Sequence, residues 1–309
     1  IAVLSGGDSS EREISLKSGR AIHSALTSLG HRCTLVDPAV TSIESLNWLD
    51  FDVAAIGLHG QFGEDGQLQK LLESKGVPFT GSDSKASAIA FSKSASKQKF
   101  VTANVPTPEF AVIRRSDNAT DIAKHALKIG YPIVVKPDAE GSSYGVTIVP
   151  SPDRLSAALA TCFQFGDVGL VERAIPGSEW TVTVIDSQPL DPICIETPRS
   201  FYDFKAKYEV DSTRYVFESS VSPSVVEQIQ SVGLQACQSL GTSGVARADL
   251  RLDQFNRPWV LEVNTIPGMT KHSLVPKAAR RAGMSFAQLC QKMVDCSLQA
   301  CHERMRKSA

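Results

Sequence analysis

In the first third of the chain, short apolar stretches typical of strands alternate with longer stretches whose apolar residues recur at helical spacing. We expect the following strands and helices there: strands over residues 1–4, 33–36, 53–58 and 77–80, and helices over 10–29 and 68–75. Parallel strands need a long crossover, usually a helix, and alternation of this kind supplies one between strands. The sequence therefore predicts an α/β protein whose N-terminal domain is a doubly wound parallel sheet.

The remaining two thirds contain two further α/β units. Residues 81–85 are rich in Gly, Ser and Asp, which marks a boundary, and a long helix is expected directly after it over 86–102. Two hairpin-like strands at 133–135 and 146–149 then enclose a glycine-rich loop. A third unit begins near Gly177. We expect domains at 1–81, 82–176 and 177–309.

Composition narrows the class of partner. The 309 residues carry a formal net charge of -1, and their basic residues are scattered, so neither nucleic acid nor an anionic membrane is an expected partner. No apolar run approaches the roughly 18 residues of a membrane span. The seven cysteines lack a Cys-x-x-Cys pair and are expected as reduced thiols in a cytoplasmic protein. No basic stretch precedes the first strand, so we expect no signal peptide.

A late strand pair carries polar residues at every second position. Arg247, Asp249 and Arg251 fall on one face of the first strand, because successive side chains of a strand point to opposite faces. Glu262 and Asn264 share a face of the second strand in the same way. The two polar rows can therefore face one cavity.

This convergence predicts a cation. Burying Asp249 and Glu262 without compensation would cost roughly several kcal/mol. Oxygen ligands suit Mg²⁺, which binds through one or two carboxylates plus substrate phosphates. Leu261 and Val263 are expected on the opposite, apolar face. The alternative is a solvated strand face whose acids pair with arginine.

The glycine-rich loop follows a lysine at the end of an apolar strand. Lys136 closes that strand, and residues 140–145 read Glu-Gly-Ser-Ser-Tyr-Gly. Backbone N–H groups and hydroxyls in such a loop can cradle an anion. The segment lacks the G-x-x-x-x-G-K-[ST] pattern of a Walker loop. Its alternative interpretation is an ordinary hairpin loop that is rich in glycine.

Two further polar residues lie near the expected ends of elements in the first domain. His59 follows a strand, and ligands of open α/β sheets bind at the carboxyl ends of strands. Glu11 opens a helix. Each has a structural alternative, since a single histidine is often a hydrogen-bonding core residue and capping already favours an acid in a first turn.

Several short motifs occur together in a characteristic order. They comprise 6–7 with 10–15, 59–60 with 63–66, 80–82, 136–137 with 140–143, 201–203 with 205–208, 244–249, 262–265, and 267–270 with 272–274. Together they resemble the D-alanine–D-alanine ligases of the ATP-grasp superfamily, over essentially the whole chain. The resemblance implies a two-subdomain ATP-grasp fold after the N-terminal domain.

The resemblance also implies an activity, namely the ATP-dependent, ADP-forming ligation of two D-alanine molecules through an acyl phosphate, for peptidoglycan precursors. For the amino acids, the resemblance implies that Glu11 and His59 bind the first D-alanine, that Ser273 and Leu274 bind the carboxylate of the second, and that Arg247 and Gly268 form the oxyanion hole. For the nucleotide, it implies Lys93, Lys136 and Lys207 at the ATP phosphates, Glu172 and Glu179 at adenine and ribose, and Asp249, Glu262 and Asn264 around two Mg²⁺ ions, which Mn²⁺ can replace. Ser142 and Tyr208 are expected to be hydrogen-bonded to Glu11 and to close a lid over 201–208.

Two features of the sequence bear on the identity of the second substrate. Tyr208 favours D-alanine, since related ligases that use D-lactate or D-serine usually differ in the lid, for instance by a phenylalanine at this place. Lys271 adds a charge near the segment for the second substrate. A non-catalytic ATP-binding regulatory protein is the alternative from another class. The resemblance further implies a homodimer.

Overall fold

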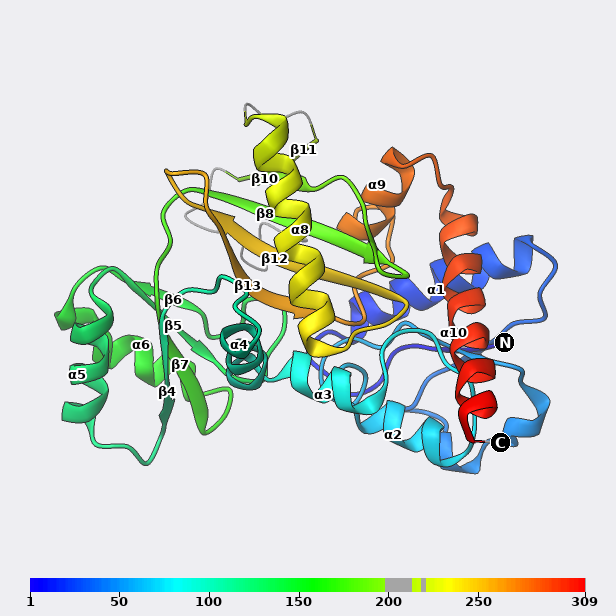
Figure 1. Cartoon of the computed structure of the whole chain (residues 1–309). Helices are drawn as coiled ribbons and strands as arrows, with labels where there is room; N and C mark the ends of the chain where they lie inside the picture. Colours follow the sequence, from blue (N-terminus) through cyan, green and yellow to red (C-terminus); the bar gives the residue numbers. More distant parts are fainter. Residues whose placement is uncertain (198–212, 218–220, 309) are drawn as a thin grey trace.

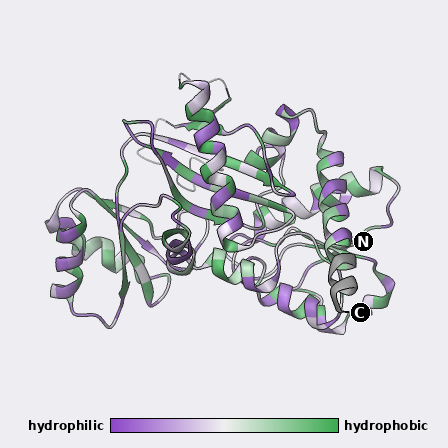
Figure 2. Cartoon of the chain, viewed as in Figure 1, coloured by the Kyte–Doolittle hydropathy of each residue, from purple (hydrophilic) through white to green (hydrophobic). Residues whose placement is uncertain are grey.

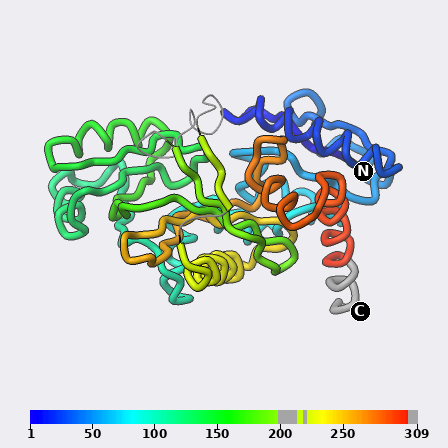
Figure 3. The backbone as a smooth tube through the Cα atoms, turned by 90° about the horizontal axis from the view of Figure 1, so that it is seen from above, coloured from blue at the N-terminus to red at the C-terminus, as the bar shows by residue number. Residues whose placement is uncertain are grey.

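Three sheets follow one another along the chain (Figure 1). The computed structural model describes residues 1–197, 213–217 and 221–308. Seen from above in Figure 3, the N-terminal part and the central part lie at opposite ends of the molecule, with the third part between them. The α/β class expected from the sequence is confirmed.

The first sheet is parallel, as predicted. Its order is β2-β1-β3, and its elements are β1 (Ala2–Leu4), α1 (Arg12–Ser28), β2 (Thr34–Val36), β3 (Ala54–Ile56) and α2 (Gln67–Ser74). All three residues of β1 are fully buried, which is typical of a central parallel strand. The strand expected at 77–80 is reduced to a single bridge between Ala54 and Phe79.

The prediction of one long helix over 86–102 is wrong, because the chain forms two helices there. They are α3 (Ser84–Phe91) and α4 (Lys93–Thr102). Ser92 lies between them in an extended conformation, and its hydroxyl accepts a hydrogen bond from the backbone N–H of Ala95 (3.2 Å). Such a cap starts a new helix. The break places Lys93 at the first position of α4.

The central sheet is antiparallel and has the order β4-β7-β5-β6. Its elements are β4 (Phe110–Arg114), α5 (Ala119–Ile129), β5 (Ile133–Pro137), β6 (Thr147–Val149), α6 (Leu155–Cys162) and β7 (Val168–Arg173). Ile133 and Val135 pack in one hydrophobic core with residues of α5 and α6, whereas Val134 and Lys136 line a cavity. Strand alternation thus gives β5 one core face and one functional face.

The third sheet has the path β11-β10-β8-β12-β13, with β9 paired to β8. Its strands are β8 (Ser178–Ile185), β9 (Gln188–Pro189), β10 (Ile193–Glu196), β11 (Arg214–Val216), β12 (Val245–Leu252) and β13 (Pro258–Asn264). Helix α8 (Pro223–Leu240) packs against one face and contributes Ile229 and Ala236 to a core with Trp180. The other face of β12 and β13 is left for polar residues.

The chain returns to the first sheet at its end. Helices α9 (Leu274–Arg281) and α10 (Phe286–Ser308) follow the third sheet, and α10 lies beside α1 (Figure 1). Leu289 of α10 shares a hydrophobic core with Val3 and Ile22. Figure 2 shows hydrophilic and hydrophobic residues interleaved along the coloured part of α10. The domain limits at 1–81, 82–176 and 177–309 stay a prediction.

None of the helices in the described part of the chain is long and apolar enough to cross a bilayer.

Candidate active site

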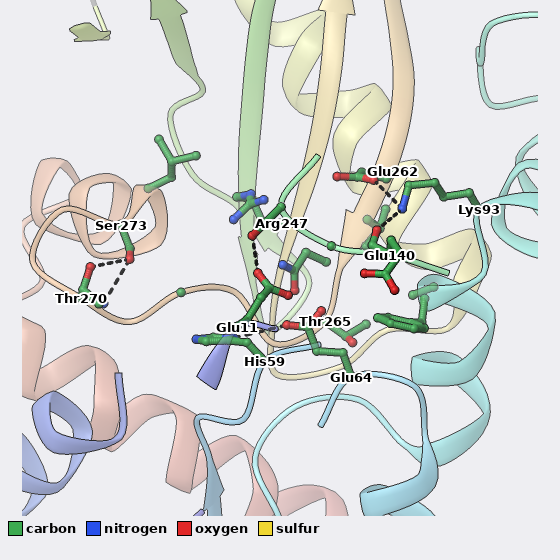
Figure 4. Close-up of a pocket in the computed structure, with 18 of the residues that line it drawn as sticks. Glu11, His59, Glu64, Lys93, Glu140, Arg247, Glu262, Thr265, Thr270 and Ser273 are labelled. Atoms are coloured by element: carbon green, nitrogen blue, oxygen red, sulfur yellow. Dashed lines mark hydrogen bonds and ion pairs between the residues drawn. The ribbon is translucent and has the colours of Figure 1, made fainter. Parts of the chain in front are cut away.

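Two cavities meet where the three sheets approach one another. Cavity 1, shown in Figure 4, is lined by residues of all three parts of the chain, including Glu11, Ser142 and Arg247. Cavity 2 lies between the central and third sheets. Lys93, Glu140 and Glu262 line both. A molecule in one cavity can therefore reach a molecule in the other at these side chains.

Glu11 directly precedes α1, and its carboxylate lines cavity 1. The side chain is buried, and the Ser142 hydroxyl of the glycine loop donates a hydrogen bond to it. Gly141 lies so close that a Cβ there would come within 2.5 Å of Glu11 Oε2. A side chain at this position would displace the Glu11 carboxylate. The arrangement provides a fixed negative charge at the wall of the cavity.

His59 lies beside Glu11 in a fully connected network. One ring nitrogen is 3.0 Å from Ser18 Oγ, and the other is 3.3 Å from Glu64 Oε1 and 3.1 Å from the Ile266 carbonyl. Burial lowers the pKa of His59, but the hydrogen bond and charge of Glu64 outweigh it and leave the pKa above its ordinary value. Burial also raises the pKa of Glu64. Both shifts favour the protonated forms of His59 and Glu64.

The register of β12 and β13 brings the predicted polar rows together. Asp249 stands opposite Glu262, and Arg247 stands opposite Asn264. The Arg247 guanidinium donates two hydrogen bonds to Asp249, at 2.7 and 2.6 Å. The Thr181 hydroxyl donates a third at 2.8 Å. The shared polar face predicted from strand alternation is thus present.

The prediction that Leu261 lies on the opposite, apolar face is wrong. Leu250 pairs with Val260 and Asp249 pairs with Glu262, so Leu261 is the extra residue of a β-bulge. A bulge interrupts the alternation of side chains along a strand. Leu261 and Glu262 consequently both line cavity 2.

The oxygen atoms of this face suit a magnesium ion. Among the described residues, no group of three or more His, Cys, Asp or Glu side chains is gathered as a metal site. Mg²⁺ needs fewer, because one or two carboxylates together with substrate phosphates are its usual ligands. Asp249 and Glu262, with the amide of Asn264 on the same face, fit that demand.

Two lysines, Lys93 and Lys136, line cavity 2 together with Val134 and Ile148. Lys93 donates to the backbone carbonyl of Glu140 at 2.6 Å and lies 3.3 Å from the Glu262 carboxylate. Lys136, from β5, donates to Glu172 of β7 at 2.7 Å. Cationic side chains facing an apolar cavity wall can hold an anionic ligand such as a polyphosphate.

Glu172 has a second partner that the sequence reading missed. Lys97 Nζ lies 2.7 Å from Glu172 Oε2, and its side chain is fully buried. Burial lowers the pKa of Lys97 to about 8, against the raising effect of Glu172. Lys97 follows Lys93 by one helical turn, and this spacing was the available signal, since residues four apart share a helix face.

The far wall of cavity 2 is formed by the third sheet. Glu179 lies 3.4 Å from the Arg251 guanidinium, on neighbouring strands. Both residues line the cavity together with Ile175.

The start of α9 closes the other end of cavity 1. Ser273 is the cap residue of this helix, and its hydroxyl is bonded to Thr270 through the backbone N–H at 3.1 Å and the side chain at 2.9 Å. Gly268 approaches closely, since a Cβ there would lie 2.8 Å from Ser273 Oγ. Leu274 is the first helical residue and lines the same cavity. Partial positive charge at a helix start favours a carboxylate.

The described residues thus bring most of the predicted site together. Lys207 and Tyr208, with the lid expected over 201–208, lie outside the described residues. The sequence reading assigned no role to Glu64, Thr181 or Thr270. Glu64 and Thr270 had a signal, because they belong to the matching motifs at 63–66 and 267–270, whereas Thr181 had none.

Comparison of the sequence with known proteins points to one family. The model of the D-ala D-ala ligase C-terminus matches residues 100–295. The D-alanine–D-alanine ligase of Gloeobacter violaceus is 42% identical, over 96% of this chain and 99% of the relative. That of Alkalilimnicola ehrlichii is 44% identical, over 95% of this chain and 93% of the relative.

Solved structures agree with the sequence relatives. A crystal structure of D-alanine–D-alanine ligase from Bacillus anthracis has a TM-score of 0.86 at 32% identity, covering 98% of both chains. The structure of that enzyme complexed with ATP has a TM-score of 0.84 at 29% identity, again over 98% of both. With its fold, its two cavities and its sequence relatives in agreement, the chain belongs to the D-alanine–D-alanine ligase family.

Proposed function

We propose that the chain joins two D-alanine molecules to D-alanyl-D-alanine, with hydrolysis of ATP to ADP driving the reaction and an acyl phosphate as the intermediate. The observation that carries this proposal is the meeting of the two cavities at Lys93, Glu140 and Glu262. D-alanine occupies cavity 1 and ATP occupies cavity 2. The reacting carboxylate and the γ-phosphate then approach each other at the shared residues.

The first step needs a carboxylate to attack a polyanion, so charge has to be neutralised. Glu11 holds the ammonium of the first D-alanine, with His59 beneath it, and this orients the carboxylate toward cavity 2. Lys93 and Lys136 hold the phosphates, and Glu172 and Glu179 lie at the adenine and ribose end. A carboxylate oxygen attacks the γ-phosphorus, the bond to ADP breaks, and an acyl phosphate forms. Fixed cations stabilise the charge that develops.

The second step joins the two amino acids. Ser273 and the backbone N–H of Leu274 receive the carboxylate of the second D-alanine at the start of α9. Its deprotonated amine attacks the acyl carbon. Arg247 and the backbone N–H of Gly268 stabilise the negative oxygen of the tetrahedral intermediate, which then releases phosphate.

Asp249, Glu262 and Asn264 would hold two Mg²⁺ ions, for which Mn²⁺ can substitute, and the ions supply charge neutralisation of the triphosphate. Arg247 orients Asp249 toward this site through its two hydrogen bonds. Ser142 ties the glycine loop to Glu11, which excludes water from the acyl phosphate.

Membership of the family supports a proposal about the setting of the reaction. We propose that the chain acts as a homodimer in the cytoplasm, where it supplies a peptidoglycan precursor. All seven cysteines are free thiols, which fits a reducing compartment.

A product assay tests the activity. Purified protein with ATP, Mg²⁺ and D-alanine should release ADP and phosphate in equal amounts and yield a dipeptide of the mass of D-Ala-D-Ala. Folded protein that yields no dipeptide under these conditions would refute the proposal, and ATP binding without turnover would favour the regulatory alternative.

The acceptor is tested separately, by competition. D-alanine, D-serine and D-lactate are offered together over a range of pH, and the products are separated by mass. We expect D-alanyl-D-alanine to dominate, and increasingly so at higher pH, because the attacking amine has to be deprotonated. A dominant ester or D-alanyl-D-serine product would reassign the second substrate.

A further inference from the structure

Three charged side chains form a cluster at the wall of cavity 2, where Lys136 and Glu172 line the cavity and Lys97 lies behind them. Glu172 is clamped between two ammonium groups, with Lys136 Nζ 2.7 Å from one carboxylate oxygen and Lys97 Nζ 2.7 Å from the other. All three side chains are buried, at 3, 5 and 0% exposure for Glu172, Lys136 and Lys97. A fully buried lysine is rare, and its desolvation has to be offset by specific partners.

The position of the Lys97 ammonium is fixed by two other parts of the chain. It donates to the Thr107 hydroxyl at 2.7 Å, and that hydroxyl donates in turn to the Val260 carbonyl of β13 at 2.8 Å. The ammonium also lies 5.5 Å from the centre of the Phe110 ring. Lys97 thus joins α4 to β7 and, through Thr107, to the third sheet.

We propose that Lys97 is a positioning residue of the nucleotide site. Its buried ammonium neutralises Glu172, so that the positive charge of Lys136 stays available to the phosphates of ATP. The cluster has one carboxylate and two ammonium groups, and therefore a net charge of one positive unit beside the cavity. Without Lys97, Lys136 and Glu172 would form a neutral pair. This inference rests on the proposed binding of ATP in cavity 2.

Three ligands of increasing negative charge distinguish this electrostatic role from a merely structural one. Adenosine, ADP and ATP are titrated against the whole protein, by calorimetry and in the presence of Mg²⁺, for the wild type and for Lys97→Met. We expect adenosine affinity to change less than about twofold, ADP affinity to fall less than ATP affinity, and ATP affinity to fall about tenfold, since removing one charge weakens a polyanion most. An equal loss for all three ligands, or no loss, would overturn the proposal.

Three further variants control for folding and for geometry. Glu172→Gln raises the net charge of the cluster, so the ratio of ATP to adenosine affinity should rise; in the double variant with Lys97→Met the ratio should return close to the wild-type value. These ratios remain a test if Lys97→Met alone does not fold, and an unchanged ratio in Glu172→Gln contradicts the inference. Thr107→Val removes a hydrogen bond but no charge and should leave the ratio unaltered.

The outcome also separates this inference from the proposed function. Wild-type protein that does not bind ATP would count against the proposed function. Wild-type protein that binds ATP and makes dipeptide, with variants whose affinity ratios do not move, would count against the role of Lys97 alone.

Discussion

The Ser142 hydroxyl donates a hydrogen bond to the Glu11 carboxylate, across 131 positions of sequence. It joins the glycine loop of the central part to the start of α1 in the first part. The loop is shaped for this contact, because Gly141 leaves room for Glu11 Oε2 and Ser142 adopts a left-handed backbone conformation with a φ of 48°. One hydrogen bond thus fixes both the carboxylate and the loop.

Ser142→Ala should lower kcat/KM for D-alanine about 10- to 100-fold, because a hydrogen bond to a charged group contributes about 1.5–3 kcal/mol. Steady-state kinetics with D-alanine as the varied substrate measure this. Ser151→Ala, which deletes a hydroxyl bonded to Asp153 away from both cavities, should leave kcat/KM unchanged. Equal kinetics for the two variants would show that the contact with Glu11 has no role in turnover.

Arg247→Ala should reduce kcat about 10²–10³-fold, the usual consequence of losing one donor of an oxyanion site. The same change deprives Asp249 of two hydrogen bonds. Single-turnover measurements of phosphate release and dipeptide formation locate the affected step. Arg214→Ala is the control, since Arg214 is an exposed partner of Glu196, and it should retain wild-type kcat. A kcat within about twofold of wild type for Arg247→Ala would rule out the oxyanion role.

Glu262→Gln should raise the Mg²⁺ concentration needed for half-maximal activity by at least about tenfold, because it exchanges a charged oxygen ligand for a neutral one. Titration of activity with Mg²⁺ checks this, and ATP binding is measured in parallel. Glu227→Gln, at an exposed position of α8, should keep the wild-type Mg²⁺ curve. If ATP binding survives and turnover by Glu262→Gln is unaffected, the metal assignment is contradicted.

The pair of His59 and Glu64 makes stability depend on pH. The pKa of His59 is raised above 6.5 in the folded protein, so from pH 6.5 up to that raised pKa the folded chain retains a proton that the unfolded chain has lost. The contribution of His59 to the free energy of unfolding is fully present below pH 6.5 and falls as pH rises through this window.

The free energy of unfolding, measured by denaturant titration from pH 6 upward, should therefore fall less steeply for His59→Gln than for the wild type. The exposed His125→Gln variant should follow the wild-type curve. Parallel curves for His59→Gln and the wild type would contradict the raised pKa.

Local periodicity of the sequence predicted much of the fold and part of the site. The parallel sheet of β1, β2 and β3 followed from strand–helix alternation, and the polar row of Arg247 and Asp249 followed from the period of two along a strand. These patterns are contained within single elements, so they can be read without knowledge of the rest of the chain.

The places where this periodicity is interrupted could not be predicted from the sequence. Ser92 divides one expected helix because its hydroxyl can cap α4 while it also donates to Asp138 at 2.8 Å. Leu261 is turned toward cavity 2 by a bulge that only the pairing of β12 with β13 reveals. Both depend on a partner that is distant in sequence or on a neighbouring strand.

The sequence by itself determined the α/β class, the polar face of β12 and β13, and, through its motifs, the family. Tertiary structure alone decided that Glu11 meets Ser142 and that Lys97 and Lys136 share Glu172. The physical reason is that an element's own periodicity selects which face is buried, whereas the partner of a buried charge is selected by the packing of whole sheets and helices.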